Sequence, residues 1–341
     1  MRARRSMLPS ALTMGEPAGV GPDVTLAAWM RRAEAGLSPF YVIGDPLLYA
    51  RRAERLGLRV PIAAATAEAA AELFAEALPV VDLGRAVAGD PGRLDDGDAG
   101  AVVASIERAV ADVRAGRAAA VVTNPIHKHA LYRAGFTHPG HTEFLGALAA
   151  DFAAPPDGVA WRPIMMLAGP DLRTVPVTVH VSLAQAARDL SAETIVATAR
   201  IVAADLVSRF GLPSPRLVVA GLNPHAGEDG AMGREDLEVI APAVAQLRAE
   251  GLDVRGPLPA DTLFHARARA TYDAALCMYH DQALIPVKTL AFDETVNVTL
   301  GLPFVRTSPD HGTALDIAGS GRALPDSLMA ALKMAAEMGG A

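Results

Sequence analysis

Short apolar runs alternate along this chain with segments of helical periodicity, and this alternation limits the fold more than any other feature. The runs that predict strands cover residues 11–14, 40–43, 118–122, 163–168, 175–181, 216–220 and 274–278. The segments that predict helices cover residues 22–35, 46–55, 63–77, 99–115, 183–210, 235–250 and 326–338. Strands that alternate with helices of this length favour an α/β fold with a largely parallel, doubly wound sheet.

The length of the chain favours two lobes. At 341 residues and 51% apolar content, the chain exceeds the usual size of one domain and can bury a substantial core. We expect a first α/β lobe formed by residues 1–135 and 275–341, and a second formed by residues 136–274. The sequence has neither a fixed-period repeat nor a linker long enough to separate independent domains.

Charge and cysteine content exclude several classes of function. The net charge of -7 argues against nucleic acid as the main partner, so any anion site must be local. The single cysteine, Cys277, has apolar neighbours and predicts a buried thiol, which fits a reducing cytoplasm. No apolar run reaches the 18 residues that would predict a membrane span.

The densest group of chemically active side chains lies in residues 279–312. This stretch supplies an imidazole (His280), an ammonium (Lys288), an amide (Asn297) and a guanidinium (Arg306), which we expect to be separated by turns and short apolar runs. The stretch follows a predicted strand, and open α/β sheets place their chemistry at strand ends. The mixture suits an anionic substrate held near a metal.

Lysine is rare in this chain. Of the 31 basic residues only Lys128, Lys288 and Lys333 are lysines. A compact, deprotonatable ammonium at Lys288 therefore indicates a functional requirement, whereas retention on a solvated face is the alternative.

A glycine-rich segment follows the first predicted strand. Residues 15–21 lead into a helix opened by Pro22 and Asp23, and a helix N-terminus attracts anions. The segment lacks the third glycine of the dinucleotide fingerprint, and no GxGxxG occurs in the chain. A phosphate or cofactor contact and a tight structural turn both remain open.

Polar residues follow two further predicted elements. His141 lies between Gly140 and a helix start, where it is placed to meet an anion. Thr142 is either a ligand contact or a helix cap. Asp261 follows two prolines and is either a cap or a partner for a positively charged group.

Three histidines lie at or near the ends of predicted strands, namely His180, His225 and His280, 45 and 55 residues apart. Parallel strands can bring such residues to one edge of a sheet, and three imidazoles with an open position match a catalytic divalent metal site. Alone, His180 falls within a predicted strand and is typical of a core residue. The residues therefore leave open a metal site or three unrelated histidines.

Seven motifs resemble those of the 4-hydroxythreonine-4-phosphate dehydrogenase family of vitamin B6 synthesis. They are GEPAGVGPD (15–23), TNPIHK (123–128), GHTEF (140–144), GLNPHAGEDGAMG (221–233), GPLPADTLF (256–264), YHDQ (279–282) and NVTLGLPFVRTSPDHGTALDIAG (297–319). The similar segments run in family order from residue 12 to residue 334. Two departures, Glu16 where Asp is also common and Asn124 where Gly is frequent, touch no metal or substrate position.

The resemblance assigns roles to individual residues. It implies the metal ligands His180, His225 and His280. It implies the substrate contacts His141, Thr142, Lys288, Asn297 and Arg306. Lys288 and Asp261 are the implied catalytic candidates, with Lys288 assisting proton transfer. No residue is assigned to the nicotinamide cofactor.

The resemblance also implies a fold related to the isopropylmalate and isocitrate dehydrogenases, whose nicotinamide site does not use GxGxxG. It implies NAD or NADP, and one divalent ion (Zn2+, Mg2+ or Co2+) per active site. It further implies a homodimer with active sites at the subunit interface, much of it carried by the second lobe.

The implied reaction is the oxidation of 4-phosphooxy-L-threonine to 2-amino-3-oxo-4-phosphooxybutanoate. This β-keto acid then loses CO2 to give 3-amino-2-oxopropyl phosphate. The alternatives are a dehydrogenase of a related substrate such as threonate 4-phosphate or an aromatic diol, a metal hydrolase with three histidine ligands, and a noncatalytic phosphometabolite-binding protein.

Overall fold

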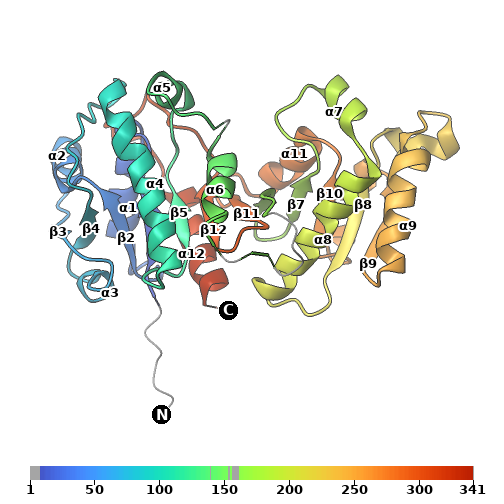
Figure 1. Ribbon diagram of the computed structural model, residues 1–341, viewed down its shortest axis with the longest axis horizontal. Helices are drawn as coiled ribbons and strands as arrows, with labels where there is room; N and C mark the ends of the chain where they lie inside the picture. Colours follow the sequence, from blue (N-terminus) through green and yellow to red (C-terminus); the bar gives the residue numbers. More distant parts are fainter. Residues whose placement is uncertain (1–7, 139, 153, 156–160, 341) are drawn as a thin grey trace, which may run out of the picture. The chain divides into compact units, whose positions relative to one another are not determined.

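The computed structural model describes residues 8–138, 140–152, 154–155 and 161–340, and it divides the chain into two compact α/β units (Figure 1). The first unit contains the residues up to Pro163 together with Leu302–Gly340, and the second contains Ile164–Gly301. The basic opening of the chain, residues 1–7, lies outside the described residues.

The unit boundaries differ from the expected ones at 135/136 and 274/275. Strand β10 (Ala274–Cys277) pairs with both β7 (Arg173–Pro176) and β8 (Arg216–Ala220), so the segment that begins at residue 274 belongs to the second unit. Helix α6 (His141–Ala149) places Phe144 in the core of the first unit, so its segment belongs there.

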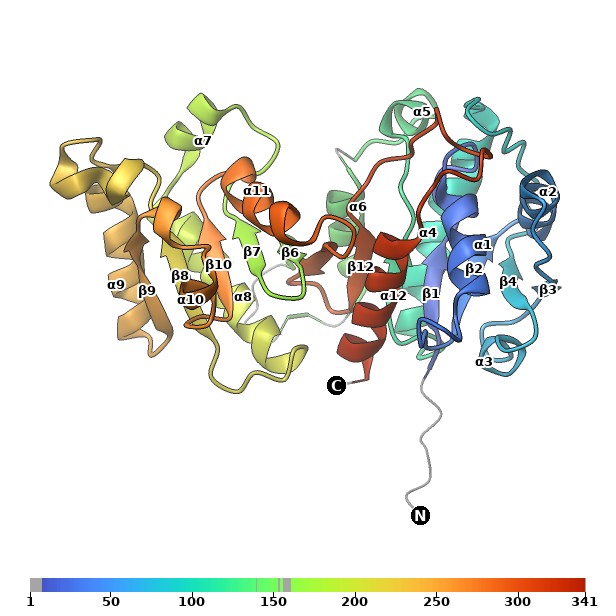
Figure 2. The same ribbon diagram turned by 180° about the vertical axis from the view of Figure 1, so that it is seen from behind.

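The first unit is a parallel sheet with the strand order β3-β4-β2-β1-β5-β12. Its strands are β1 (Ser10–Thr13), β2 (Phe40–Gly44), β3 (Ile62–Ala64), β4 (Leu78–Asp82), β5 (Val121–Thr123) and β12 (Arg306–Pro309). Its helical segments are α1 (Gly21–Met30), α2 (Pro46–Leu56), α3 (Ala70–Leu73), η1 (Asp96–Asp98), α4 (Ala99–Arg114), α5 (Lys128–Arg133), α6 and α12 (Asp326–Gly339). Helix α4 covers one face of this sheet (Figure 1), and α1 and α12 cover the other (Figure 2).

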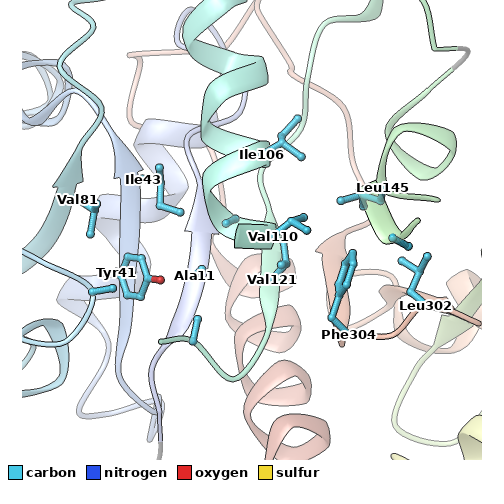
Figure 3. Close-up of a cluster of buried hydrophobic side chains, with 14 of the residues drawn as sticks. Ala11, Tyr41, Ile43, Val81, Ile106, Val110, Val121, Leu145, Leu302 and Phe304 are labelled. Atoms are coloured by element: carbon cyan, nitrogen blue, oxygen red, sulfur yellow. The ribbon is translucent and has the colours of Figure 1, made fainter. Parts of the chain in front are cut away.

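The core of the first unit lies between the sheet and α4 (Figure 3). Ile106 and Val110 of α4, four residues apart and so on one helix face, pack in a cluster with Ile43 of β2 and Val121 of β5. Burial of this apolar surface stabilises the unit, at roughly 25 cal/mol per Å² removed from water.

The second unit has the strand order β11-β6-β7-β10-β8-β9. Strand β6 (Ile164–Ala168) is antiparallel to β7 and to β11 (Val296–Leu300), whereas β7, β10, β8 and β9 (Asp253–Leu258) are parallel. Its helical segments are α7 (Leu183–Asp189), α8 (Ala192–Ser208), η2 (Pro224–Gly230), η3 (Asp236–Ile240), α9 (Ala241–Ala249), η4 (Ala260–Thr262), α10 (Ala266–Arg269) and α11 (His280–Ala291). Helix α8 covers one face of the sheet (Figure 1) and α11 the other (Figure 2). The prediction of a largely parallel, doubly wound α/β fold is therefore confirmed.

Four predicted elements were wrong in extent or type. The helix predicted over 183–210 is broken into α7 and α8, because Ser191 caps α8 through its side chain. The helix predicted over 63–77 is largely absent, because its first residues pair with β4 as strand β3. The strand predicted over 175–181 ends at Pro176, and the stretch expected to contain only turns and short apolar runs begins with helix α11. Within the described residues, no helix is long and apolar enough to cross a membrane.

The glycine-rich loop after β1 is a tight structural turn. The backbone N–H of Ala18 donates to the Glu16 carboxylate (3.1 Å), and burial raises the pKa of that carboxyl. The N–H of Gly19 donates to the Glu16 carbonyl (3.0 Å). The N–H of Val20 donates to the Thr313 carbonyl (2.9 Å). Because a phosphate cradle needs free N–H groups, these bonds leave the loop unsuited to a cofactor phosphate.

Arg52 fixes this loop from the other side. Its guanidinium donates to the carbonyls of Pro17 (2.9 Å), Gly19 (2.9 Å) and Gly89 (3.2 Å), and it forms an ion pair with Asp23. Arg52 is 2% exposed and Asp23 is 4% exposed, so both charges depend on each other for compensation.

We predict that Arg52→Met lowers the free energy of unfolding by about 3–5 kcal/mol, because it leaves the buried carboxylate of Asp23 without its cation. Chemical unfolding of both proteins measures the difference. The matched control is Arg51→Met, since the neighbouring Arg51 side chain is 51% exposed and its loss should cost about 1 kcal/mol or less. Equal losses in the two variants would contradict the role given to Arg52.

Candidate active site

Three loops of the second unit begin at one edge of its sheet. Strands β7, β10 and β8 are adjacent and parallel, so their carboxyl ends share that edge. His180 follows β7, His280 follows β10 and His225 follows β8. The expectation that parallel strands would bring the histidine-bearing loops to a common edge is confirmed, although His180 lies beyond its strand rather than inside it.

Hydrogen bonds tie these loops together. The Thr178 hydroxyl donates to the Met278 carbonyl (2.7 Å), which joins the loops that carry His180 and His280. The buried Gln282 accepts from the Met278 N–H (2.7 Å) and donates its amide to the Gly221 carbonyl (2.8 Å) at the start of the third loop. As a result, the rings of His180 and His280 have centroids 5.8 Å apart.

Two of the three histidines have an unusual backbone. His180 has a φ of 51° and His225 a φ of 53°, both in the left-handed region. His225 opens a run of six residues that all have positive φ, ending at Gly230. A residue other than glycine in this region costs of order 1–3 kcal/mol, and such strain persists at functional sites that the surrounding structure holds in place.

Asp236 supplies much of that support. Its carboxylate is fully buried and accepts from the N–H of Leu222 (2.9 Å), the N–H of Asn223 (3.1 Å) and the Asn223 amide (3.0 Å). The fold thus anchors the segment that immediately precedes His225. Sequence reasoning missed Asp236, because it lies beyond the motif at residues 221–233 and reads as an ordinary helix-surface acid.

The charges beside the histidines suit metal ligation. Nδ1 of His280 lies 2.7 Å from a carboxylate oxygen of Asp281, and Nδ1 of His225 lies 3.8 Å from one of Glu228. The hydrogen bond to Asp281 orients the His280 ring and leaves its Nε2 for a metal, whereas 3.8 Å is too long for a hydrogen bond between His225 and Glu228. Within the described ranges, no group of three or more His, Cys, Asp or Glu side chains is arranged to hold a metal ion. The chain thus brings together two of the three histidines, His180 and His280.

The other candidates of the second unit lie on different elements. Lys288 is half-buried on α11, the helix that His280 opens, with its Nζ 5.4 Å from the ring centroid of Phe292. Asn297 is half-buried on β11, paired with Leu167 of β6. Asp261 is exposed in η4.

In the first unit, His141 lies close enough to Arg306 and Lys128 for their positive charges to act on its imidazole. The buried Arg306, the first residue of β12, donates to the Thr123 hydroxyl at the end of β5 (2.7 Å). Burial lowers the pKa of Arg306 to about 10, so the guanidinium remains charged at neutral pH. His141 opens α6, and its buried Nε2 has no hydrogen-bond partner within the described ranges.

His141 is held neutral. Burial lowers the pKa of its imidazole well below 6.5, and the positive charges of Arg306 and Lys128 lower that pKa further. Thr142 is the second residue of α6, whose N-cap is Gly140, so Thr142 does not cap the helix. A neutral imidazole offers one N–H donor, which suits hydrogen bonding to an anion beside a guanidinium.

The burial of a neutral His141 predicts a pH dependence of stability. As the pH falls from 6.5 towards the lowered pKa of His141, the unfolded chain binds a proton that the folded chain does not, so the free energy of unfolding decreases. At higher pH both states are neutral and this contribution vanishes. We expect His141→Gln to flatten the pH dependence below 6.5 in chemical unfolding experiments.

The matched control for this prediction is His129→Gln, which removes an exposed imidazole of the same unit and should preserve the wild-type profile. Parallel profiles for the wild type and His141→Gln would show that His141 is not buried in its neutral form.

Comparisons with known proteins identify the family of the chain. A model of the family described as pyridoxal phosphate biosynthetic protein PdxA matches residues 37–335. A Bradyrhizobium diazoefficiens protein, described as 4-hydroxythreonine-4-phosphate dehydrogenase, is 59% identical over 347 residues that cover 99% of each chain.

Solved structures give the same result. The crystal structure of a 4-hydroxythreonine-4-phosphate dehydrogenase from Klebsiella pneumoniae superposes with a TM-score of 0.83 at 35% identity, covering 97% of this chain and 99% of that one. A terephthalate 1,2-cis-dihydrodioldehydrogenase from Burkholderia xenovorans LB400 superposes with a TM-score of 0.63 at 28% identity, covering 97% and 98%. The family resemblance of the motifs is thereby confirmed: the chain belongs to the pyridoxal phosphate biosynthetic protein PdxA family.

Proposed function

We propose that this chain, an oxidoreductase, oxidises 4-phosphooxy-L-threonine to 2-amino-3-oxo-4-phosphooxybutanoate with NAD or NADP, in pyridoxine 5'-phosphate biosynthesis. The observation that carries the substrate assignment is the buried Arg306 beside the neutral His141, a local anion site in a chain of net charge -7. Membership of the family and the relatives named as 4-hydroxythreonine-4-phosphate dehydrogenases support the reaction.

The chemistry requires a hydride and a proton to leave the substrate. The C3 hydrogen passes as hydride to the nicotinamide, and the hydroxyl proton passes to a base. The product carries a carbonyl β to its carboxylate and loses CO2 readily, giving 3-amino-2-oxopropyl phosphate. Lys288 and Asp261 are the side chains that we assign to proton transfer.

We assign the divalent metal to His180, His280 and His225. The contact of the first two rings and the carboxylates beside His280 and His225 fit this donor set. When bound, a divalent ion supplies electrostatic stabilisation of negative charge on the C3 oxygen. Zn2+, Mg2+ and Co2+ are the candidate ions.

The substrate contacts divide between two groups of residues. Arg306, His141 and Thr142 form the group that we assign to the phosphate, and Lys288 and Asn297 supply a further ammonium and amide. We do not assign the cofactor phosphate to the glycine-rich loop, since the N–H groups of Ala18, Gly19 and Val20 are bonded within the protein.

We also propose a homodimer in which a neighbouring subunit completes the active site. Exposed apolar side chains lie on α7 and along α11, the helices that follow His180 and begin at His280, among them Leu183 (63% exposed), Ile285 (63%) and Phe292 (70%). Apolar surface of this kind favours a protein partner. We place the enzyme in the cytoplasm, where the buried Cys277 remains reduced.

A related substrate is the second candidate. The likeness to a terephthalate 1,2-cis-dihydrodioldehydrogenase keeps an aromatic diol under test, and threonate 4-phosphate shares the phosphate. A metal hydrolase or a noncatalytic binding protein would produce no reduced cofactor. The absorbance of reduced NAD or NADP, followed with metal-loaded enzyme on each substrate, therefore tests the proposed function directly.

We predict that Arg306→Ala lowers kcat/KM for 4-phosphooxy-L-threonine by at least about tenfold, because a charge-assisted hydrogen bond contributes about 1.5–3 kcal/mol. On unphosphorylated 4-hydroxythreonine, which makes no phosphate contact, the same variant should lose little. Steady-state kinetics on both substrates give the comparison. An equal fractional loss on the two would remove Arg306 from the phosphate site.

We further predict that the metal ligands come from two chains. His180 and His280 lie together in one chain, so mixing variants of these two should restore no activity. Mixing His225→Ala with His280→Ala should restore part of it, because one site of a mixed dimer keeps all its ligands. Each variant alone should bind less metal by elemental analysis.

The control for the mixing experiment is the mixture of His180→Ala and His280→Ala. The mixture of His225→Ala and His280→Ala is tested under conditions in which labelled subunits exchange. If it then regains no activity, all three ligands come from one chain. Full turnover by verified metal-free enzyme would reject the metal assignment itself.

A further inference from the structure

The TNPIHK motif positions one residue to which the proposed reaction assigns no role, Lys128. The motif follows β5, and its buried Asn124 amide donates to the Thr13 carbonyl (3.1 Å) and to the Thr25 hydroxyl (3.0 Å). The His127 side chain then caps α5 by accepting from the Ala130 N–H (3.3 Å). These bonds fix the backbone position of Lys128, the first residue of α5, from which its side chain extends.

The ammonium of Lys128 faces the start of α6. Its Nζ lies 3.3 Å from the position that a Cβ on Gly140 would occupy, and an oxygen of Glu143 lies 2.8 Å from the same position. Gly140 has a φ of -171°, which any residue adopts. The absence of a side chain at Gly140 therefore leaves space, which the Lys128 ammonium occupies beside the start of the helix.

Lys128 and Arg306 both act on one imidazole. Each positive charge lowers the pKa of His141, in addition to the effect of burial. An anion bound at the unpartnered Nε2 of His141 would therefore lie within the influence of both cations.

We propose that Lys128 binds the phosphate of the substrate together with Arg306 and His141. This inference rests on the proposed function and extends it, since a phosphate monoester carries about -1.5 to -2 charge at neutral pH and one guanidinium neutralises only part of it. Arg306 is buried and offers a rigid pair of N–H donors, whereas the exposed Lys128 offers a mobile point charge. The chain has only three lysines, and an ammonium here suits that mobile role.

The test compares variants of the same unit. Lys128→Met removes the ammonium, Lys128→Arg keeps the charge, and Lys333→Met is the matched control that removes an exposed lysine from α12. Inorganic phosphate is the probe in calorimetric binding, and kinetics are measured on 4-phosphooxy-L-threonine and on unphosphorylated 4-hydroxythreonine.

We expect Lys128→Met to weaken phosphate binding and to raise KM for the phosphorylated substrate by about tenfold or more, with a smaller effect on kcat. Lys128→Arg should recover most of the loss, and Lys333→Met should match the wild type. On the unphosphorylated substrate Lys128→Met should change little. Phosphate affinity equal to that of Lys333→Met, or an equal loss on both substrates, would overturn the proposal.

Gly140→Ala provides a second variant that keeps every charge. The added methyl group meets only the flexible ends of Lys128 and Glu143, so it should displace the ammonium and leave the fold intact. It should weaken phosphate binding in the same direction as Lys128→Met, and unchanged binding would count against the proposal.

The phosphate-binding measurement separates this inference from the proposed function. Wild-type enzyme that reduces no cofactor with the phosphorylated substrate would reject the function, while the binding of phosphate would still report on Lys128. If the wild type turns over normally and Lys128→Met binds phosphate as tightly as the wild type, this inference alone would be rejected.

Discussion

The parallel pairing of β7 and β10 is the constraint on which the proposed metal site depends, because it brings His180 and His280 of one chain together, and the pairing of β10 with β8 places the loop of His225 at the same edge. Parallel strands end at the same edge of a sheet, so the loops that follow them begin side by side although they are far apart in sequence. Gln282 converts this proximity into fixed geometry, because its one amide binds the end of β10 and the loop after β8. With this support, His180 and His225 adopt the left-handed backbone conformation, which is unfavourable for residues other than glycine in an isolated loop.

The fold was predictable from the sequence where burial alone determines the pattern. Helix α4 was expected because its apolar residues recur at the spacing of one buried helix face. Strand β8 was expected because it is a short continuous apolar run, as in a strand buried on both faces. Strand β9 was missed because it contains a charged Arg255 and the Gly256-Pro257 pair, which read as a turn. The break between α7 and α8 was missed because the capping serine, Ser191, is neutral in a helical pattern until its backbone contact is known.

The candidate site was predictable in its residue types more than in its geometry. Polar residues after apolar runs identified the histidine loops, because strand ends carry chemistry in any open α/β sheet. The supporting roles of Asp236 and Gln282 were not predicted. Both side chains bond backbone groups of the loop after β8, and the sequence pattern does not reveal these contacts. The exposure of Asp261 and the helical position of Lys288 likewise depend on tertiary structure.

Anion recognition in an acidic protein has to be local, and the phosphate site that we propose for the first unit meets this requirement with few residues. A net charge of -7 repels an anionic substrate at long range, but salt screens that repulsion beyond about 8 Å. At close range the buried Arg306 dominates, because a charge removed from water interacts more strongly with a bound anion. A protonated His141 would add a third charge to this site, yet burial and its two cationic neighbours keep it neutral. In the proposed phosphate site, the imidazole is thereby limited to directional hydrogen bonding, and the phosphate charge is left to the guanidinium of Arg306 and to the mobile ammonium of Lys128.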